Sequence, residues 1–136
     1  MLRSVKLKDH MVTNPVTVSA KDSVLEAIDN IITNKVSGVC VVDSDNNLVG
    51  IVSELDCLNA ILNATYNGSG SDVGSVENIM TKEVVTASPS DDIVDTAAAM
   101  MKVRHRRRPV VLDGKLVGQV TVRQLLGAVK EFSGAS

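Results

Sequence analysis

The chain has 136 residues, with 14 Lys and Arg against 16 Asp and Glu, which gives a formal net charge of −2. This length suits one well-buried domain, or two half-size modules that share a core, and the charge predicts no general attraction to nucleic acid or anionic membranes. Hydrophobic residues make up 44% but aromatic residues only 1%, so the core must be aliphatic and stacking platforms for single-stranded nucleic acid are scarce.

The first half of the chain predicts a leading turn that closes at Met11 and then four elements in order. Val16 begins a short β-type run, and the capping-box pattern Ser23-x-x-Glu26 opens an amphipathic helix. An apolar run, a turn rich in Asp and Asn, and a second apolar run follow as a β-hairpin, and a helical pattern follows the hairpin. We therefore expect a strand, a helix, a hairpin and a helix at residues 16–18, 23–35, 39–53 and 54–62.

The second half repeats this order after residues 63–75, which are rich in Gly, Ser and Asn and are typical of a flexible connector. We expect a leading turn over residues 76–80, a strand over 84–86, a helix that starts at Pro89 with residues 90–92 and runs to about 103, a hairpin over 109–121 and a helix over 122–131. The predicted organisation is one repeat over residues 1–62, a linker over 63–75 and a second repeat over 76–136.

One stretch of nine residues occurs twice in similar form and defines the repeat. Residues 48–56 read LVGIVSELD, and residues 116–124 read LVGQVTVRQ. Upstream, Met11 matches Met80 at a spacing one residue larger than that of Gly50 and Gly118. The sequence predicts an α/β (α+β) fold made of two β-α-β-β-α repeats that pack as a pseudo-twofold pair, since a repeat of about 60 residues is marginal alone.

Cysteine and histidine usage gives no pattern that points to catalysis. Cys40 and Cys57 lie in apolar surroundings and are predicted to be reduced core thiols of an intracellular, cytoplasmic protein. We find no signal-peptide pattern and no apolar run of the roughly 20 residues that span a bilayer. His10 and His105 are the only histidines, and no metal spacing, catalytic triad or phosphate-loop motif is present. We expect no enzyme activity, no metal and no required cofactor.

The repeated motifs resemble those of the CBS domain, and their tandem arrangement is similar to a CBS pair, or Bateman module. The match rests on the Met-x-x-x-x-Val-x-Thr type of leading segment, the VVD-type hairpin and the Gly-h-x-Ser/Thr-x-x-Asp motif, and it covers residues from about 7 to 130. The resemblance implies a module that binds adenosine-containing ligands such as AMP, ADP, ATP, NAD or S-adenosylmethionine in the clefts between the two copies.

Carried over by position, the resemblance assigns a role to several residues of the first copy. Ser53 would contact phosphate, Asp56 would hold the ribose diol, and Thr17 and Val18 would line the base through backbone groups. A carboxylate can accept hydrogen bonds from two adjacent hydroxyls, and a hydroxyl at a helix start lies beside free N–H groups that attract phosphate. The alternative interpretation of Ser53 is a helix N-cap, where hydroxyls are common.

The second copy keeps the hydroxyl positions Thr86 and Thr121, but Gln124 replaces the acid of the motif. The resemblance therefore implies a second site that is weak, altered or empty. The basic run 104–108 has no charged counterpart in the first copy beyond Lys35, and within it Arg106 and Arg107 take positions where similar proteins neutralise phosphate. One nucleotide could then have its ribose held by copy one and its phosphates met by copy two. A solvated charged rim is the alternative.

The resulting hypothesis is a regulatory module that senses an adenine nucleotide and transmits this to an effector protein of unknown identity. A homodimer is expected, because the apolar faces of the helices exceed what one small core needs. A structural or dimerisation module with vestigial clefts remains the first alternative. Nucleic-acid binding through residues 104–108 is a weaker one, because the net charge is acidic and aromatic residues are few.

Overall fold

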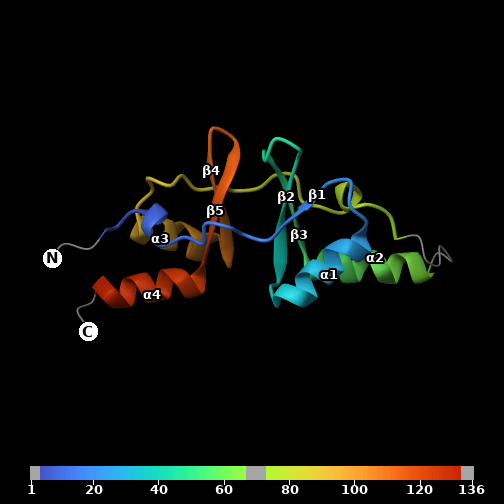
Figure 1. Ribbon diagram of the computed structural model, residues 1–136. Helices are drawn as coiled ribbons and strands as arrows, with labels where there is room; N and C mark the ends of the chain where they lie inside the picture. Colours follow the sequence, from blue (N-terminus) through green and yellow to red (C-terminus); the bar gives the residue numbers. More distant parts are fainter. Residues whose placement is uncertain (1–3, 67–72, 133–136) are drawn as a thin grey trace. The chain divides into compact units, whose positions relative to one another are not determined.

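The computed structural model describes residues 4–66 and 73–132. Its elements fall into two compact units, shown in Figure 1. One unit is continuous, Val16–Val84, and is called the β1–β3 unit here. The other combines Met1–Pro15 with Val85–Ser136 and is called the β4–β5 unit.

The β1–β3 unit contains a three-stranded sheet with the strand order β1-β2-β3. β1 runs parallel to β2, and β2 runs antiparallel to β3, with Thr17 opposite Cys40 and Gly38 opposite Ser53. The Ser23 hydroxyl caps the first helix by accepting from the Glu26 N–H at 3.1 Å, as the sequence pattern predicts. The elements are β1 Thr17–Ser19, α1 Val24–Asn34, β2 Gly38–Val42, β3 Leu48–Ser53, α2 Glu54–Tyr66 and the 3-10 turn η2 Val76–Asn78.

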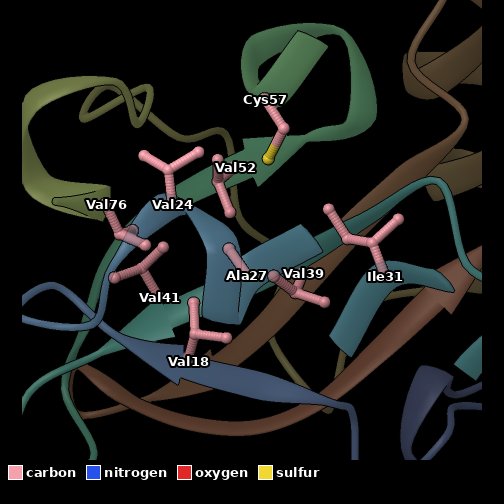
Figure 2. Close-up of a cluster of buried hydrophobic side chains, with 9 residues drawn as sticks. All are labelled: Val18, Val24, Ala27, Ile31, Val39, Val41, Val52, Cys57 and Val76. Atoms are coloured by element: carbon pink, nitrogen blue, oxygen red, sulfur yellow. The ribbon is translucent and has the colours of Figure 1, made fainter. Parts of the chain in front are cut away.

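Aliphatic side chains from all of these elements form the core of the β1–β3 unit (Figure 2). Alternate residues of the central strand, Val39 and Val41, point from the sheet toward Ala27 of α1, and Cys57 joins the cluster from α2. Val76 of η2 is completely buried in the same cluster. The core is therefore aliphatic, as the near absence of aromatic residues predicts.

The β4–β5 unit repeats the helix, hairpin and helix of the first unit. Its two long strands are antiparallel, with Arg107 opposite Thr121 and Val110 opposite Gly118. Leu7, Ile93 and Val110 are completely buried in its core. The elements are the 3-10 turn η1 Leu7–Asp9, α3 Ile93–Val103, β4 Arg107–Leu112, β5 Lys115–Thr121 and α4 Val122–Phe132.

The strand expected over residues 84–86 does not form. Only one residue of this segment's neighbourhood, Ala87, makes a bridge, and it pairs in parallel with Val110. The reason is a proline: Pro109 stands where β2 has Cys40, and it has no N–H to donate to the carbonyl of Val85, two residues before the bridge. The carbonyl of Pro109 still accepts from the Ala87 N–H at 2.9 Å, so the ladder is reduced to a single residue.

The helix expected over residues 54–62 continues to Tyr66. Ala64 is buried, and the Thr65 hydroxyl donates to the Ile61 carbonyl at 2.9 Å. These contacts extend α2 by one turn beyond residue 62, where the large apolar residues that predict the helix end. Residues 63–66 of the predicted linker are thus helical, and its residues 67–72 lie outside the described residues.

The leading segment of each sequence repeat lies in the unit formed by the other repeat. Val12 pairs antiparallel with Gln119 of β5, and Thr81 pairs antiparallel with Ile51 of β3. The Leu7 N–H also donates to the Asp91 carbonyl at 2.9 Å. The sequence repeats cover residues 1–62 and 76–136. The boundaries of the compact units therefore differ from those of the sequence repeats.

Two large apolar residues of the helices are exposed. Ile32 of α1 and Met101 of α3 each keep 69% of their surface in contact with solvent. Their neighbours Ile31 and Met100 take the buried positions. Within the described residues, no helix is both long enough and apolar enough to cross a membrane.

Candidate functional site

Ser53 and Asp56 form a reciprocal hydrogen-bonded cap at the start of α2. The Ser53 N–H donates to Asp56 Oδ2 at 2.9 Å, and the Asp56 N–H donates to Ser53 Oγ at 3.1 Å. This is the geometry of a capping box, with the acid three residues after the hydroxyl. Both side chains are half-buried. The helix-cap interpretation of Ser53 thus describes the local structure, and Asp56 belongs to the same cap.

Thr121 and Gln124 make the same arrangement at the start of α4. The Thr121 N–H donates to the Gln124 side-chain oxygen at 2.9 Å, and the Gln124 N–H donates to Thr121 Oγ1 at 3.3 Å. The replacement of the acid by an amide therefore keeps the cap. It removes the negative charge, which is what distinguishes the two motifs chemically.

The candidate residues of each unit gather at one end of its sheet. In the β1–β3 unit, Thr17 begins β1 at the end where Ser53 closes β3, because β1 and β3 are antiparallel across β2. In the β4–β5 unit, Arg107 and Thr121 are direct cross-strand partners. Thr86 immediately precedes the bridge at Ala87 and is exposed.

Val18 can offer only its backbone to a ligand, because its side chain is buried in the core. Thr17 and Val18 line a groove of about 440 Å³ whose other walls are the turn over residues 19–22 and residues 42–44. Ser53 and Asp56 do not line this groove. Thr17 therefore starts β1 at the sheet end where Ser53 lies and also lines the groove, whereas Ser53 and Asp56 lie outside the groove.

The turn that follows β1 contains an acid, Asp22, whose counterpart in the other unit is Asp91. Asp22 Oδ2 accepts from the Ser19 N–H at 2.9 Å, and Asp91 Oδ2 accepts from the Ser88 N–H at 2.9 Å in the other unit. The two acids stand 69 positions apart, which is the spacing of Met11 and Met80. They shape the turn, while Ser23 and Asp92 cap the helices.

The basic run 104–108 is not a continuous exposed strip. Arg104, His105 and Arg106 are exposed, and Arg107 is half-buried. Arg108 keeps only 8% of its surface exposed, and its Nε has no hydrogen-bond partner among the described residues. Its counterpart in the first repeat is the core residue Val39. The exposed charge available for contacting a nucleic acid is therefore smaller than the sequence suggests.

Both cysteines are buried and carry free thiols, as predicted. Burial of the Cys57 side chain, together with the neighbouring Asp56 carboxylate, raises the pKa of its thiol. The thiol is thus kept in its neutral form beside the candidate ribose-binding acid. Among residues 4–66 and 73–132, no three His, Cys, Asp or Glu side chains gather as metal ligands would.

Comparison with a known family decides how these repeated motifs should be classified. The sequence model of the CBS domain matches residues 7–63 and again residues 76–131. The chain belongs to the CBS domain family. The two matches cover most of the chain and correspond to the two repeats, so the chain contains a tandem CBS pair with the mixed α and β fold expected from the sequence.

Solved CBS pairs share this fold over nearly their whole length. CBSX2 in complex with AMP is 29% identical, with a TM-score of 0.84, and the match covers 96% of this chain and 99% of that one. The CBS pair of protein MJ0100 in complex with 5-methylthioadenosine and S-adenosyl-L-methionine is 27% identical, with a TM-score of 0.76, over 96% of this chain and 98% of that one.

Curated relatives include enzymes that contain a similar region. The inosine-5'-monophosphate dehydrogenase of Methanocaldococcus jannaschii is 35% identical over 127 residues, which is 92% of this chain and 24% of the enzyme. The chain spans between 22% and 39% of the length of the first curated relatives that it matches. CBS pairs are thus found both as short chains and as parts of larger proteins.

Proposed function

We propose that this chain is a regulatory module that binds an adenosine-containing nucleotide and changes its affinity for a partner protein when it does so. The observation that carries the proposal is the Ser53–Asp56 pair at the end of β3, at the same end of the sheet as the start of β1. This is the position at which CBS pairs place the hydroxyl and acid of their ligand motif. The similar structures with AMP and with S-adenosylmethionine support an adenosine ligand.

Asp56 supplies the charge that holds the ribose diol. A carboxylate has about four acceptor positions, and the cap to the Ser53 N–H occupies one of them on Oδ2. Enough capacity remains to accept from two adjacent ribose hydroxyls by charge-assisted hydrogen bonds. Ser53 contacts a phosphate beside the start of α2, while Thr17 and the backbone of Val18 contact the base.

A second group of residues, at the matching end of the β4–β5 unit, offers positive charge instead. Arg106 is exposed, and Arg107 lies opposite Thr121 across the strand pair. Guanidinium groups bind phosphate oxygens in bidentate fashion. Arg106, Arg107, Thr86 and Thr121 therefore contact phosphate, and Gln124 makes this group a poor holder of a ribose.

The proposed module acts as a homodimer. Several large apolar side chains of the helices are exposed, and exposed apolar surface of this kind marks interaction sites in proteins. They are Ile32, Leu55, Leu58, Leu62, Met101 and Leu126. The partner protein that receives the signal is of unknown identity.

A structural module that binds no ligand is the second candidate function. The observation that favours it is the reciprocal cap itself, because a helix start alone explains both Ser53 and Asp56. The two functions differ in whether Asp56 contributes charge to a ligand or only an acceptor to the helix.

Calorimetric titration of two Asp56 variants with adenosine, AMP, ATP, NAD and S-adenosylmethionine separates these functions. Asp56→Asn keeps a side-chain acceptor for the cap but removes the charge, whereas Asp56→Ala removes both. Loss of a charge-assisted bond of about 1.5 to 3 kcal/mol weakens binding by roughly 10-fold to 150-fold. Both variants should lose affinity for the ligand that binds the parent chain.

The matched control is Gln124→Ala, which removes the equivalent cap from α4 without touching Asp56. It should leave adenosine affinity unchanged. If no compound binds the parent chain, or if Asp56→Asn binds as the parent does, the ribose site is wrongly assigned. A ligand at 100 times its dissociation constant also adds about 2.7 kcal/mol of stability, so a thermal-shift screen should identify the compound to titrate.

A further inference from the structure

Arg108 is a charged residue in a core position. It keeps only 8% of its surface exposed, and its counterpart in the first repeat, Val39, is 1% exposed. Among residues 4–66 and 73–132, its Nε is the one buried side-chain nitrogen or oxygen without a hydrogen-bond partner. A buried donor without an acceptor is rare in folded proteins and needs a specific explanation. The valine of the first repeat shows that packing alone does not require an arginine here.

The tip of the Arg108 side chain reaches the surface of the β4–β5 unit. Arg108 stands two positions before Val110 on β4, so both side chains lie on the same face of the strand. Val110 packs in the core cluster that contains Leu125 of α4. The Nη atoms of Arg108 make no hydrogen bond within the described residues, and unlike Nε they are not enclosed. The guanidinium is therefore sunk into the helix-covered face of the strand, with its outer edge open to solvent.

This end of the β4–β5 unit is rich in bases. The Arg106 carbonyl accepts from the Val122 N–H at 3.0 Å, which holds the basic run 104–108 against the start of α4. The first turn of α4 contains Arg123 and no acid, whereas the first turn of α2 contains two acids. Between Lys102 and Arg123 the sequence has one acid, Asp113, which lies in the hairpin turn at the other end of the strands. The positive charge at this end therefore has no counter-charge from the same segment.

Phosphate groups have the chemistry that this end of the unit can bind. Guanidinium groups donate two parallel hydrogen bonds to phosphate oxygens, and helix starts attract anions. The Thr121 hydroxyl accepts from the Gln124 N–H at 3.3 Å, so its own O–H can still donate to an anion. The basic run and Arg123 carry more positive charge than one terminal phosphate, of about −2, can neutralise. This excess favours a chain of several phosphates.

We propose that the β4–β5 unit binds a polyphosphate chain and that Arg108 makes its affinity rise with the number of phosphate groups. The inference rests on the proposed function for the adenosine end of the ligand, and it narrows the ligand class to adenosine di- and triphosphates. Arg106 and Arg107 can contact any phosphate from the rim of the unit. Arg108 differs from them because its buried Nε destabilises the free chain, and binding of a phosphate to the guanidinium offsets that cost.

Calorimetric titration of the full chain with adenosine, AMP, ATP and inorganic triphosphate tests the proposal. The parent chain should bind ATP at least about 10-fold more tightly than AMP. Arg108→Val should weaken ATP binding by roughly 10-fold to 150-fold through loss of a charge-assisted hydrogen bond, and it should change adenosine affinity by less than about twofold. Arg108→Met, which keeps an unbranched side chain, should show the same loss.

Inorganic triphosphate separates the two sources of the chain. If the parent binds it and Arg108→Val does not, the site takes the polyphosphate itself. If only ATP shows this loss, the site takes the chain as part of a nucleotide. ATP that binds no more tightly than inorganic triphosphate would keep the polyphosphate site and overturn the adenosine ligand.

The matched control is Lys102→Met, which removes an exposed charge near the end of α3. It should leave ATP affinity within about twofold of the parent value, because water and salt screen an exposed charge. Each variant is also melted without ligand, and Arg108→Val should melt no lower than the parent. Equal ATP affinity in Arg108→Val and the parent would overturn the role of Arg108. A parent chain that binds adenosine, AMP and ATP equally would overturn the polyphosphate site and leave the proposed function standing.

Discussion

A β-carbon on Gly50 would lie 2.7 Å from the Sδ of Met80 and 2.9 Å from the carbonyl oxygen of Thr81. The same relationship recurs in the other unit, where a β-carbon on Gly118 would lie 2.6 Å from the Sδ of Met11 and 2.8 Å from the carbonyl oxygen of Val12. Each repeated glycine therefore makes room for the leading segment of the opposite sequence repeat.

The close approach predicts that Gly50→Ala and Gly118→Ala destabilise the fold. Met80 and Met11 can move aside, but the backbone carbonyl is held in a strand pair with Ile51 or Gln119. We expect a loss of about 1 to 3 kcal/mol in the free energy of unfolding by urea. Gly127→Ala is the control, because its β-carbon would meet nothing within 4 Å, and in the helix it should add about 0.5 to 1 kcal/mol.

Replacement of Arg108 by valine should stabilise the folded chain. Its Nε is buried without a partner among the described residues, and its counterpart Val39 is 1% exposed. An unsatisfied buried donor costs about 1 to 3 kcal/mol, so Arg108→Val should raise the free energy of unfolding by a similar amount. Arg106→Val, at an exposed position, should change it by less than about 0.5 kcal/mol. A loss of stability in Arg108→Val would show that the guanidinium is needed for packing.

Asp56 predicts a stability effect as well as a binding effect. The Asp56 carboxylate is part of the cap of α2, because it accepts from the Ser53 N–H. Loss of a capping interaction costs about 0.5 to 2 kcal/mol. Asp56→Asn should lose less than Asp56→Ala in urea unfolding, and equal losses would show that the charge, not the acceptor, supports the helix.

Gln124→Asp tests why the second motif differs from the first. The shorter acid restores the charge at the start of α4 while keeping an oxygen near the Thr121 N–H. Titration with adenosine and AMP should then show stronger binding, or an additional site, relative to the parent chain. Unchanged stoichiometry and affinity would mean that the amide is not what limits this group of residues.

Cys57 predicts a pH dependence of stability. Because its thiol pKa is raised in the folded chain, the unfolded chain loses the proton at lower pH than the folded chain does. The contribution of Cys57 is therefore fully present below the ordinary thiol pKa of about 8.5 and is lost as pH rises through the folded value. The melting temperature should fall less steeply between about pH 8 and pH 10 in Cys57→Ala than in the parent. Parallel curves would exclude this contribution.

The elements and motifs were accessible from the sequence because they rest on local rules. Hydrophobic periodicity predicts the ends of α1 and α4 to within a residue or two. The hydroxyl of Ser23 marks the start of α1. Pro109 was visible, but its effect on the strand before Ala87 depends on a ladder between distant residues. The repeat was equally clear, yet a repeat spacing does not say which copy Met11 packs against. The partner of a segment is decided by tertiary contacts such as the one at Gly118.

The sequence motif likewise located Ser53 and Asp56 but did not distinguish their two roles. The capping geometry requires the same residue types at the same spacing as the ligand motif, so the pattern alone predicts both. The burial of Arg108 was also unexpected, since a run of five basic residues is usually a solvated face. In both cases the missing information is where the neighbouring strands lie.

The exchange of leading segments has a consequence for the order in which the chain can fold during synthesis. The β1–β3 unit is continuous, so all of its residues are available once Val84 has left the ribosome. Leu7 and Met11 are made well before Asp91 and Gly118, the residues that they contact in the β4–β5 unit. The segment over residues 7–12 must therefore stay undocked on the nascent chain until Gly118 has been made, which is when the β4–β5 unit can close.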